Sequence, residues 1–243
     1  WEWHMTRLIA GAETIKLKIP LTPLEILEKT KELIYLNGSK NCIARLTVTR
    51  GSSERGYDFT GDEISTSLIC LYEMPATEKK SVSLSITNTR VAASDILTKI
   101  KSNNKLSSIM AKRFAKERNT DDGLMINSEG NITETSSANI FCIKDGVVRT
   151  PPINDGVLPG VTRRLTLGLA SYLGLAVKEE SITPMNLKQA NAIFVTSAAT
   201  GIRNVEQIEE TKFSKNKLVN QLQKAYDEEL SKHELLAAKS TGS

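Results

Sequence analysis

The sequence predicts a mixed α/β (α+β) protein, and three observations support this fold class. Apolar residues recur at helical spacing in some segments and alternate with polar residues in others. Several alternating segments are joined by short turns typical of hairpins, and the regular strand–helix succession of a doubly wound sheet is missing. The chain has 243 residues, 40% hydrophobic and 25% charged, which is enough for one or two domains with a sizeable core.

A linker-like stretch at residues 74–77 divides the chain into two expected domains. Residues 1–75 form a small N-terminal domain, and residues 76–243 form a larger C-terminal one. In the first domain, Thr22-Pro23 followed by Glu25 is typical of a capped helix start. The elements expected there are helices over residues 1–15 and from residue 22, and strands over residues 42–49 and 68–72.

The second domain is expected to combine hairpins with three helices. Asp145-Gly146 is a strong turn signal between two alternating segments. The expected elements are strands at residues 81–87, 124–127, 132 onward, 140–143, 147 onward and 193–196, and helices at 104–118, from 161 and across 219–230.

Composition and motifs exclude several classes of protein. The net charge is only +4, no polybasic block exists and aromatics make up 5%, so a nucleic-acid partner is not expected. No apolar run reaches the ~18 residues of a membrane span, and neither GxGxxG nor GxxxxGK[ST] occurs.

The three cysteines lie far apart and lack CxxC spacing, so we expect reduced core residues in a cytoplasmic protein and no metal site: Cys42, Cys70 and Cys142. The chain begins at Trp1 inside an amphipathic pattern, without an initiator methionine. We therefore expect further residues upstream of this numbering.

Three stretches could carry chemistry. Leu158-Pro159-Gly160 opens a helix whose free N–H groups would attract an anion. Glu134 lies among small hydroxyl residues before an apolar strand, and Lys101 lies among other cations at a helix entry. Taken alone, these are equally a loop-to-helix junction, a solvated turn and a solvated basic cluster. Together they provide an amine, a carboxylate and a phosphate cradle, which are the groups that pyridoxal 5′-phosphate (PLP) needs.

These motifs resemble those of the class IV (fold type IV) PLP-dependent aminotransferases, a family that also includes 4-amino-4-deoxychorismate lyases. The resemblance implies a two-domain fold, with a small α/β domain, a larger domain built on a pseudo-barrel sheet, and a homodimer. It also implies a role for each matching residue. Lys101 in I-K-x-x-N would form the Schiff base, Glu134 in E-x-x-x-x-N-I-F would pair with the pyridine nitrogen, Arg7 in H-x-x-R-L and Gly160, Val161 and Thr162 in G-V-T-R would hold the phosphate, and Ser197 would substitute for the usual threonine at Ala198.

The loop over residues 48–57 resembles that of the lyases and D-amino-acid enzymes, as does Asn104-Lys105. Arg50 or Arg55 could bind a substrate carboxylate through the guanidinium fork, although each could equally be a solvated loop arginine. We therefore expect a lyase that converts 4-amino-4-deoxychorismate to 4-aminobenzoate and pyruvate for folate synthesis. The alternatives are transamination of branched-chain or D-amino acids with a 2-oxo acid and, more remotely, a PLP-binding domain without turnover.

Overall fold

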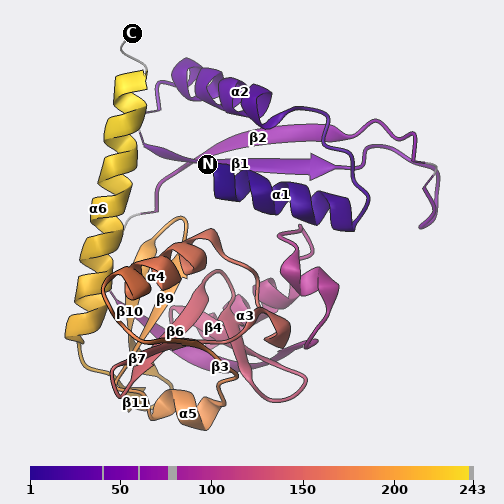
Figure 1. Ribbon diagram of the computed structural model, residues 1–243. Coiled ribbons are helices and arrows are strands. Elements are labelled where there is room, and N and C mark those ends of the chain that lie inside the picture. The colour runs from indigo at the N-terminus through magenta and orange to yellow at the C-terminus, as the bar shows by residue number, and fades with distance from the viewer. Residues whose placement is uncertain (40, 60, 76–80, 241–243) are drawn as a thin grey trace. The chain divides into compact units, whose positions relative to one another are not determined.

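The computed structural model describes residues 1–39, 41–59, 61–75 and 81–240. The chain divides into two compact units, Trp1–Ala76 and Thr77–Ser243, and each has its own arrangement of helices and strands (Figure 1).

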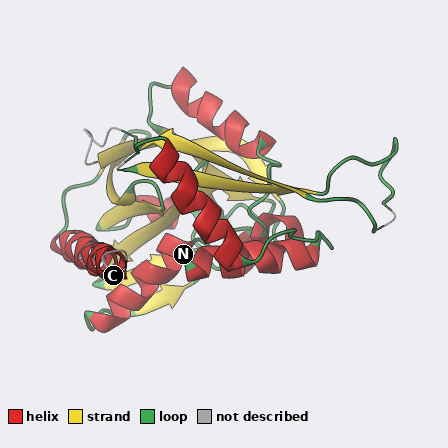
Figure 2. Ribbon diagram, turned by 90° about the horizontal axis from the view of Figure 1, so that it is seen from above, coloured by secondary structure: helices red, strands yellow, loops and turns green. Residues whose placement is uncertain are grey.

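The first unit consists of two helices and a two-stranded antiparallel ribbon. The expected capping box is present, because the Thr22 side chain accepts from the Glu25 N–H while the Glu25 carboxylate accepts from the Thr22 N–H at 2.7 Å. A long loop joins the two strands, and Figure 2 shows it extending beyond the ribbon. The elements are α1 (Glu2–Thr14), α2 (Pro23–Leu36), β1 (Cys42–Thr49) and β2 (Thr66–Glu73).

Six strands of the second unit close into a ring. β10 pairs with β3 and β3 with β4, both in parallel, whereas the pairs β4–β5, β5–β6, β6–β9 and β9–β10 are antiparallel. This ring confirms the pseudo-barrel that the family resemblance implied. Its strands are β3 (Ser81–Val91), β4 (Asp122–Asn127), β5 (Ile132–Thr135), β6 (Asn139–Lys144), β9 (Ala192–Ser197) and β10 (Gly201–Ile208).

Further strands and helices surround the ring. β7 pairs with β6 and with β8, and β11 pairs with β10. The remaining elements are α3 (Leu106–Glu117), β7 (Val147–Thr150), α4 (Val161–Tyr172), β8 (Val177–Glu179), α5 (Pro184–Lys188), β11 (Thr211–Lys212), α6 (Lys217–Ser240) and the short 3₁₀ turns η1 (Ile96–Lys99) and η2 (Ile153–Asp155).

Alternation of side chains along the strands produces two apolar clusters, one on each face of the sheet. Ile193 and Val195 of β9 belong to the cluster that also contains Ile140 and Cys142 of β6. Phe194 lies on the opposite face and stacks on Phe141, with ring centroids 4.9 Å apart. This second cluster also contains Ala170 of α4 and three residues of α6: Val219, Leu222 and Tyr226. It therefore joins these two helices to the ends of β6 and β9.

Helix α3 has the expected position in the sequence, but its apolar stripe does not face the core. The residues buried on α3 are Ala111 and Ala115, whereas Leu106, Ile109 and Met110 are exposed. The close approach to the sheet explains the small residues, because a Cβ at Gly123 of β4 would lie 2.1 Å from the Ala111 carbonyl oxygen. The outward stripe is thus available to a partner.

Two predictions about cysteines and membranes can be compared with the structure. Cys142 is buried and Cys42 and Cys70 are half-buried, and all three are free thiols. Within the described part of the chain, no helix combines the length and the apolar character needed to cross a bilayer.

Candidate active site

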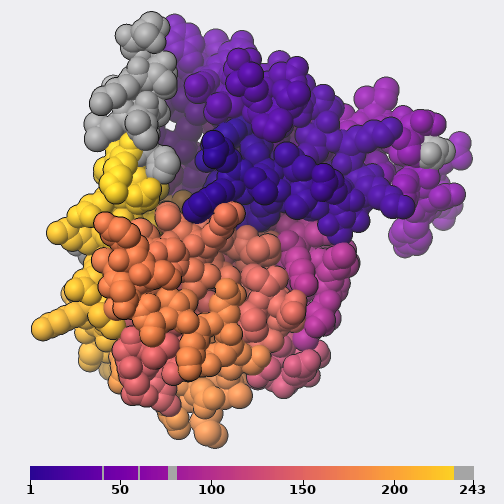
Figure 3. Space-filling view, in the orientation of Figure 1, coloured from indigo at the N-terminus to yellow at the C-terminus, as the bar shows by residue number. Residues whose placement is uncertain are grey.

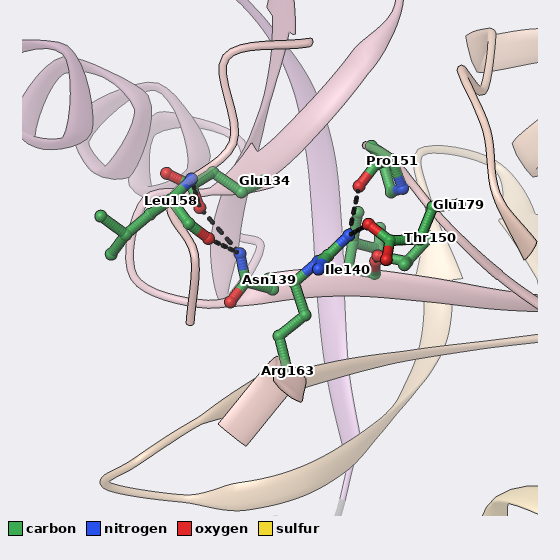
Figure 4. A network of polar contacts seen from close by, with 8 residues as sticks. All are labelled: Glu134, Asn139, Ile140, Thr150, Pro151, Leu158, Arg163 and Glu179. Carbon is green, nitrogen blue, oxygen red and sulfur yellow. Dashed lines mark hydrogen bonds and ion pairs between the residues drawn. The ribbon is translucent and has the colours of Figure 1, made fainter. Parts of the chain in front are cut away.

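Glu134 lies on β5, directly opposite Asn139 of β6 in the strand register. Its carboxylate accepts from the Asn139 side-chain amide at 3.0 Å and from the backbone N–H of Leu158 at 3.2 Å. The same Asn139 amide donates to the Leu158 carbonyl at 3.0 Å (Figure 4). These contacts fix the carboxylate against the loop that leads to α4.

The electrostatic environment of Glu134 keeps it poised between its two protonation states. Burial raises the pKa of Glu134 to about 7, because removal from water disfavours the charged form. The Leu158 N–H and the charges of Lys105, Lys101 and Arg163 act in the opposite direction. A cationic partner brought to this carboxylate would therefore favour its ionised form.

The three clustered lysines have different surroundings. Lys101 is exposed, Lys105 is half-buried just before α3, and the charges of both act on Glu134. Lys99 instead donates to the Asn154 side-chain oxygen at 3.0 Å. The amine proposed for Schiff-base chemistry and the carboxylate therefore belong to one electrostatic site, and Lys105 adds a second cation to it.

The mouth of α4 lies next to this carboxylate. Gly160 is the N-cap residue and no side chain caps the helix. A Cβ at Gly160 would lie 2.0 Å from the Asn139 side-chain oxygen, so only glycine permits this approach. Val161 and Thr162 follow in the first turn, where backbone N–H groups and the helix dipole favour a bound anion.

The end of β9 lies beside the same asparagine, because Thr196 is the register partner of Asn139. Ser197 follows, and its hydroxyl contacts the Thr200 hydroxyl at 2.8 Å. Ala198 is exposed and offers no hydroxyl. The Thr196 hydroxyl oxygen is buried and has no hydrogen-bond partner among the described residues. A buried, unsatisfied hydroxyl at this strand end fits a polar ligand.

Arg163, which ends the G-V-T-R motif, has a structural role. This residue is 5% exposed, and its guanidinium donates to the Pro151 carbonyl at 2.9 Å and forms an ion pair with Glu179 of β8 (Figure 4). It anchors α4 to the β7–β8 edge.

The arginines expected from the first unit have distinct environments there. Arg7 of α1 is half-buried, with Nη2 3.5 Å from Nδ1 of His4. Arg50 donates to the carbonyls of Lys16 and Ile15 at 3.0 and 2.6 Å, and its guanidinium carbon lies 4.3 Å from the centroid of the Phe59 ring. Arg55 is exposed in the loop between β1 and β2.

Sequence reasoning did not assign roles to two residues that shape this site. Asn139 was only one letter of a motif, yet it links Glu134 to Leu158 and lies under Gly160. Lys105 was noted for its pattern, not for its proximity to Glu134. A polar residue at the start of an otherwise apolar strand was the one available signal for Asn139.

Comparison with known proteins identifies the class to which this fold and site belong. Residues 1–208 match the family described as amino-transferase class IV. The chain belongs to this family and is an enzyme of its PLP-dependent kind.

Two sequence relatives carry aminotransferase names. The chain is 30% identical over 227 residues to a "Putative branched-chain-amino-acid aminotransferase" of Methanocaldococcus jannaschii, covering 93% of this chain and 78% of the relative. It is 27% identical over 240 residues to the D-alanine aminotransferase of Staphylococcus aureus, covering 96% and 83%.

Solved structures give the same architecture. A "Putative 4-amino-4-deoxychorismate lyase" from Legionella pneumophila superposes with a TM-score of 0.85 at 26% identity, covering 91% of this chain and 82% of the other. The branched-chain amino acid aminotransferase of a T.th. strain, complexed with N-(5′-phosphopyridoxyl)-L-glutamate, has a TM-score of 0.85 at 25% identity, covering 93% and 77%. The cofactor of this family is pyridoxal 5′-phosphate, and the second unit presents a carboxylate, an uncapped helix mouth and an unsatisfied hydroxyl that fit it.

Proposed function

We propose that this enzyme is a lyase that converts 4-amino-4-deoxychorismate to 4-aminobenzoate and pyruvate. The two products together contain every atom of the substrate, so no water and no second substrate is consumed. The ether bond to the side chain breaks, the proton from the amine-bearing ring carbon is removed, and a proton is delivered to the departing three-carbon fragment.

The observation that carries this proposal is the second cation beside Glu134. Lys105 acts on that carboxylate together with Lys101, so the site offers more positive charge than the reacting amine alone provides. A substrate that carries two carboxylates benefits from this extra charge. The 0.85 TM-score with the Legionella protein named for this activity also supports the proposal.

Lys101 is the residue proposed to handle protons. PLP, when bound, supplies an electron-withdrawing ring that makes the proton on the amine-bearing carbon acidic. The Lys101 amine removes that proton and returns one to the three-carbon product. Its exposure on the segment before α3 allows the side chain to reach a substrate atom.

Glu134 is proposed to hold a proton on the ring nitrogen. The Asn139 amide and the Leu158 N–H fix the carboxylate in one orientation. Because the pKa of this carboxyl is about 7 before a partner arrives, an adjacent pyridinium would stabilise the ionised form and draw the pair together.

The phosphate is proposed to bind at the start of α4 and the end of β9. Backbone N–H groups from Val161 onward and the Thr162 hydroxyl provide donors on one side, and Ser197 provides a hydroxyl on the other. Arg7 remains a proposal as the cationic phosphate ligand. Between the loop arginines, Arg55 is the better candidate for a substrate carboxylate, since Arg50 already donates to two backbone carbonyls.

A multiple-turnover assay tests the reaction. The enzyme is incubated with 4-amino-4-deoxychorismate and no oxo acid, and pyruvate and 4-aminobenzoate are measured. A lyase returns to its starting state each cycle, so both products should exceed the enzyme many-fold in equal amounts. Products limited to one per active site would contradict the proposal.

The second candidate is transamination, which the names of the sequence relatives favour. It uses the same lysine and carboxylate, but the amino group stays on the enzyme until a 2-oxo acid removes it. Turnover of L-valine or D-alanine only when 2-oxoglutarate is present would establish this activity. A domain that binds PLP without turnover is least supported, because Lys101 and Glu134 are both present and electrostatically coupled.

We further propose that the enzyme is a homodimer that uses the exposed face of α3. Leu106, Ile109 and Met110 share one side of this helix and are 67%, 61% and 47% exposed. Clustered exposed apolar residues mark interaction surfaces, whereas isolated ones do not. Sedimentation should show a dimer for the native chain and a monomer for Ile109→Arg, while Met185→Arg on α5 should remain dimeric. A native monomer would contradict this assignment.

A further inference from the structure

Helix α6 lies along the second unit beside α4 and β10, as Figures 1 and 3 show. Tyr226, which is 6% exposed, is one of its inward-facing residues. Its ring packs on Gly201, where an added Cβ would lie 2.8 Å from the Tyr226 Cε1 atom. Gly201 has a φ of +62° and directly follows Thr200, so the ring supports the turn that holds Ser197 and Thr200.

The hydroxyl of the same tyrosine reaches α4. Tyr226 and Thr162 share a side-chain hydrogen bond. Thr162 is 6% exposed, and its backbone carbonyl accepts from the Thr166 hydroxyl at 2.8 Å. The threonine is thus held from two directions, by α6 at its hydroxyl and by the next turn of α4 at its backbone.

One side chain therefore contacts both walls of the proposed phosphate site. The ring touches the β9–β10 turn and the hydroxyl touches the first turn of α4. Gln223, one turn earlier on α6, donates to the Ile202 carbonyl at 3.1 Å and fixes the helix against the same turn. Neither contact is needed to fill the apolar cluster, which phenylalanine would fill equally well.

We propose that Tyr226 is a positioning residue for phosphate recognition, which sets the direction of the Thr162 hydroxyl and holds the turn after Ser197. The proposal rests on the assignment of the start of α4 as the phosphate site. When Tyr226 donates its proton to the Thr162 oxygen, the Thr162 proton is left to be donated to a phosphate oxygen. Burial raises the pKa of Tyr226, which keeps its proton in place.

The test compares cofactor affinity with and without the phosphate group. The full-length enzyme is reloaded with PLP or with pyridoxal, and dissociation constants are measured by equilibrium dialysis for the native chain and for Tyr226→Phe. Loss of one hydrogen bond predicts about three- to tenfold weaker PLP binding. Pyridoxal binding should be unchanged, because pyridoxal lacks the phosphate. Tyr172→Phe on the exposed side of α4 is the matched control and should change neither constant.

A double-variant comparison separates positioning from general stability. If Tyr226 acts through Thr162, the combination Tyr226→Phe with Thr162→Ala should bind PLP no more weakly than Thr162→Ala alone. Additive losses, or an equal loss of PLP and pyridoxal in Tyr226→Phe, would overturn the role of Tyr226. If the native enzyme binds PLP and pyridoxal equally well, the phosphate site itself is misassigned and the inference falls with it. Failure of the lyase assay would leave these affinities unaffected, so the two outcomes are distinguishable.

Discussion

Glu134 in the ring and Arg50 in the first unit are both charged groups fixed by backbone contacts, but the surroundings differ. Glu134 accepts one backbone N–H and one amide, and burial raises its pKa to about 7. Arg50 is satisfied by two carbonyls near the end of α1 and by the Phe59 ring. The neighbouring loop, residues 51–59, is exposed throughout.

This difference separates cofactor chemistry from substrate choice. A carboxylate that is oriented but only half-ionised gains from a cationic partner, so the Glu134 region is prepared for a ligand. Arg50 has little left to offer a substrate, because its two terminal nitrogens already have backbone acceptors. Substrate choice within the first unit is therefore assigned to Arg55.

The largest effect is expected for Glu134→Ala. Without the carboxylate, the ring nitrogen loses its proton and the ring accepts charge poorly, so turnover should fall at least tenfold, or ~1.4 kcal/mol in activation free energy. Steady-state kinetics of the PLP-loaded variant measures this directly.

The matched control is Glu129→Ala, which removes an exposed carboxylate from the hairpin turn before β5. Its turnover should equal that of the native enzyme. If Glu134→Ala retained turnover within about a factor of two, Glu134 would not be the ring partner.

A smaller and divided effect is expected for the two loop arginines. Arg55→Lys should raise KM about tenfold without changing stability, because an ammonium cannot reproduce the guanidinium fork. Arg50→Lys should instead lower the stability of the first unit by about 1 kcal/mol, through lost carbonyl contacts and the lost ring contact.

Kinetics and thermal unfolding of both variants test this division, with the surface substitution Arg113→Lys as control. The reverse pattern, with KM raised by Arg50→Lys and unchanged by Arg55→Lys, would refute the assignment of Arg55.

The smallest effect concerns pH and the cofactor-free protein. The folded-state pKa of Glu134, about 7, exceeds the ~4.3 of an unfolded glutamate, so the folded state binds this proton more tightly. The resulting stabilisation is complete below ~4.3 and is lost as pH rises to about 7. Glu134→Gln has no such proton to lose.

Melting temperatures of both proteins between pH 5 and 8 provide the measurement. The advantage of Glu134→Gln over the native chain should grow by a few degrees up to about pH 7 and then level off. A difference that is constant with pH would show that Glu134 is not buried enough to titrate there.

The local elements of the fold were predictable, whereas its long-range pairings were not. Alternation and Asp145-Gly146 correctly indicated the β6–β7 hairpin, and the Thr22 capping box located α2. The strand β10 was missed, because Arg203, Asn204 and Glu206 interrupt its apolar pattern. Its parallel pairing with β3 joins residues more than 100 positions apart, which no local pattern encodes.

The candidate site was predictable as motifs but not as contacts. Lys101, Glu134 and Gly160 stood out by residue type and spacing, whereas the contact between Asn139 and Gly160 depends on the ring closing between β6 and β9. Tyr226 was visible only as part of the apolar stripe of a helix, because its contact with Thr162 exists only once α6 packs on α4.

The central claim is that the reactive amine of this site is Lys101. Borohydride reduction of the PLP-loaded enzyme, followed by proteolysis and mass spectrometry, locates the lysine to which the cofactor becomes permanently attached. We expect the phosphopyridoxyl mass on the peptide that contains Lys101, at one group per chain. Attachment at Lys105, whose charge also acts on Glu134, or at Lys99, which pairs with Asn154, would contradict the account.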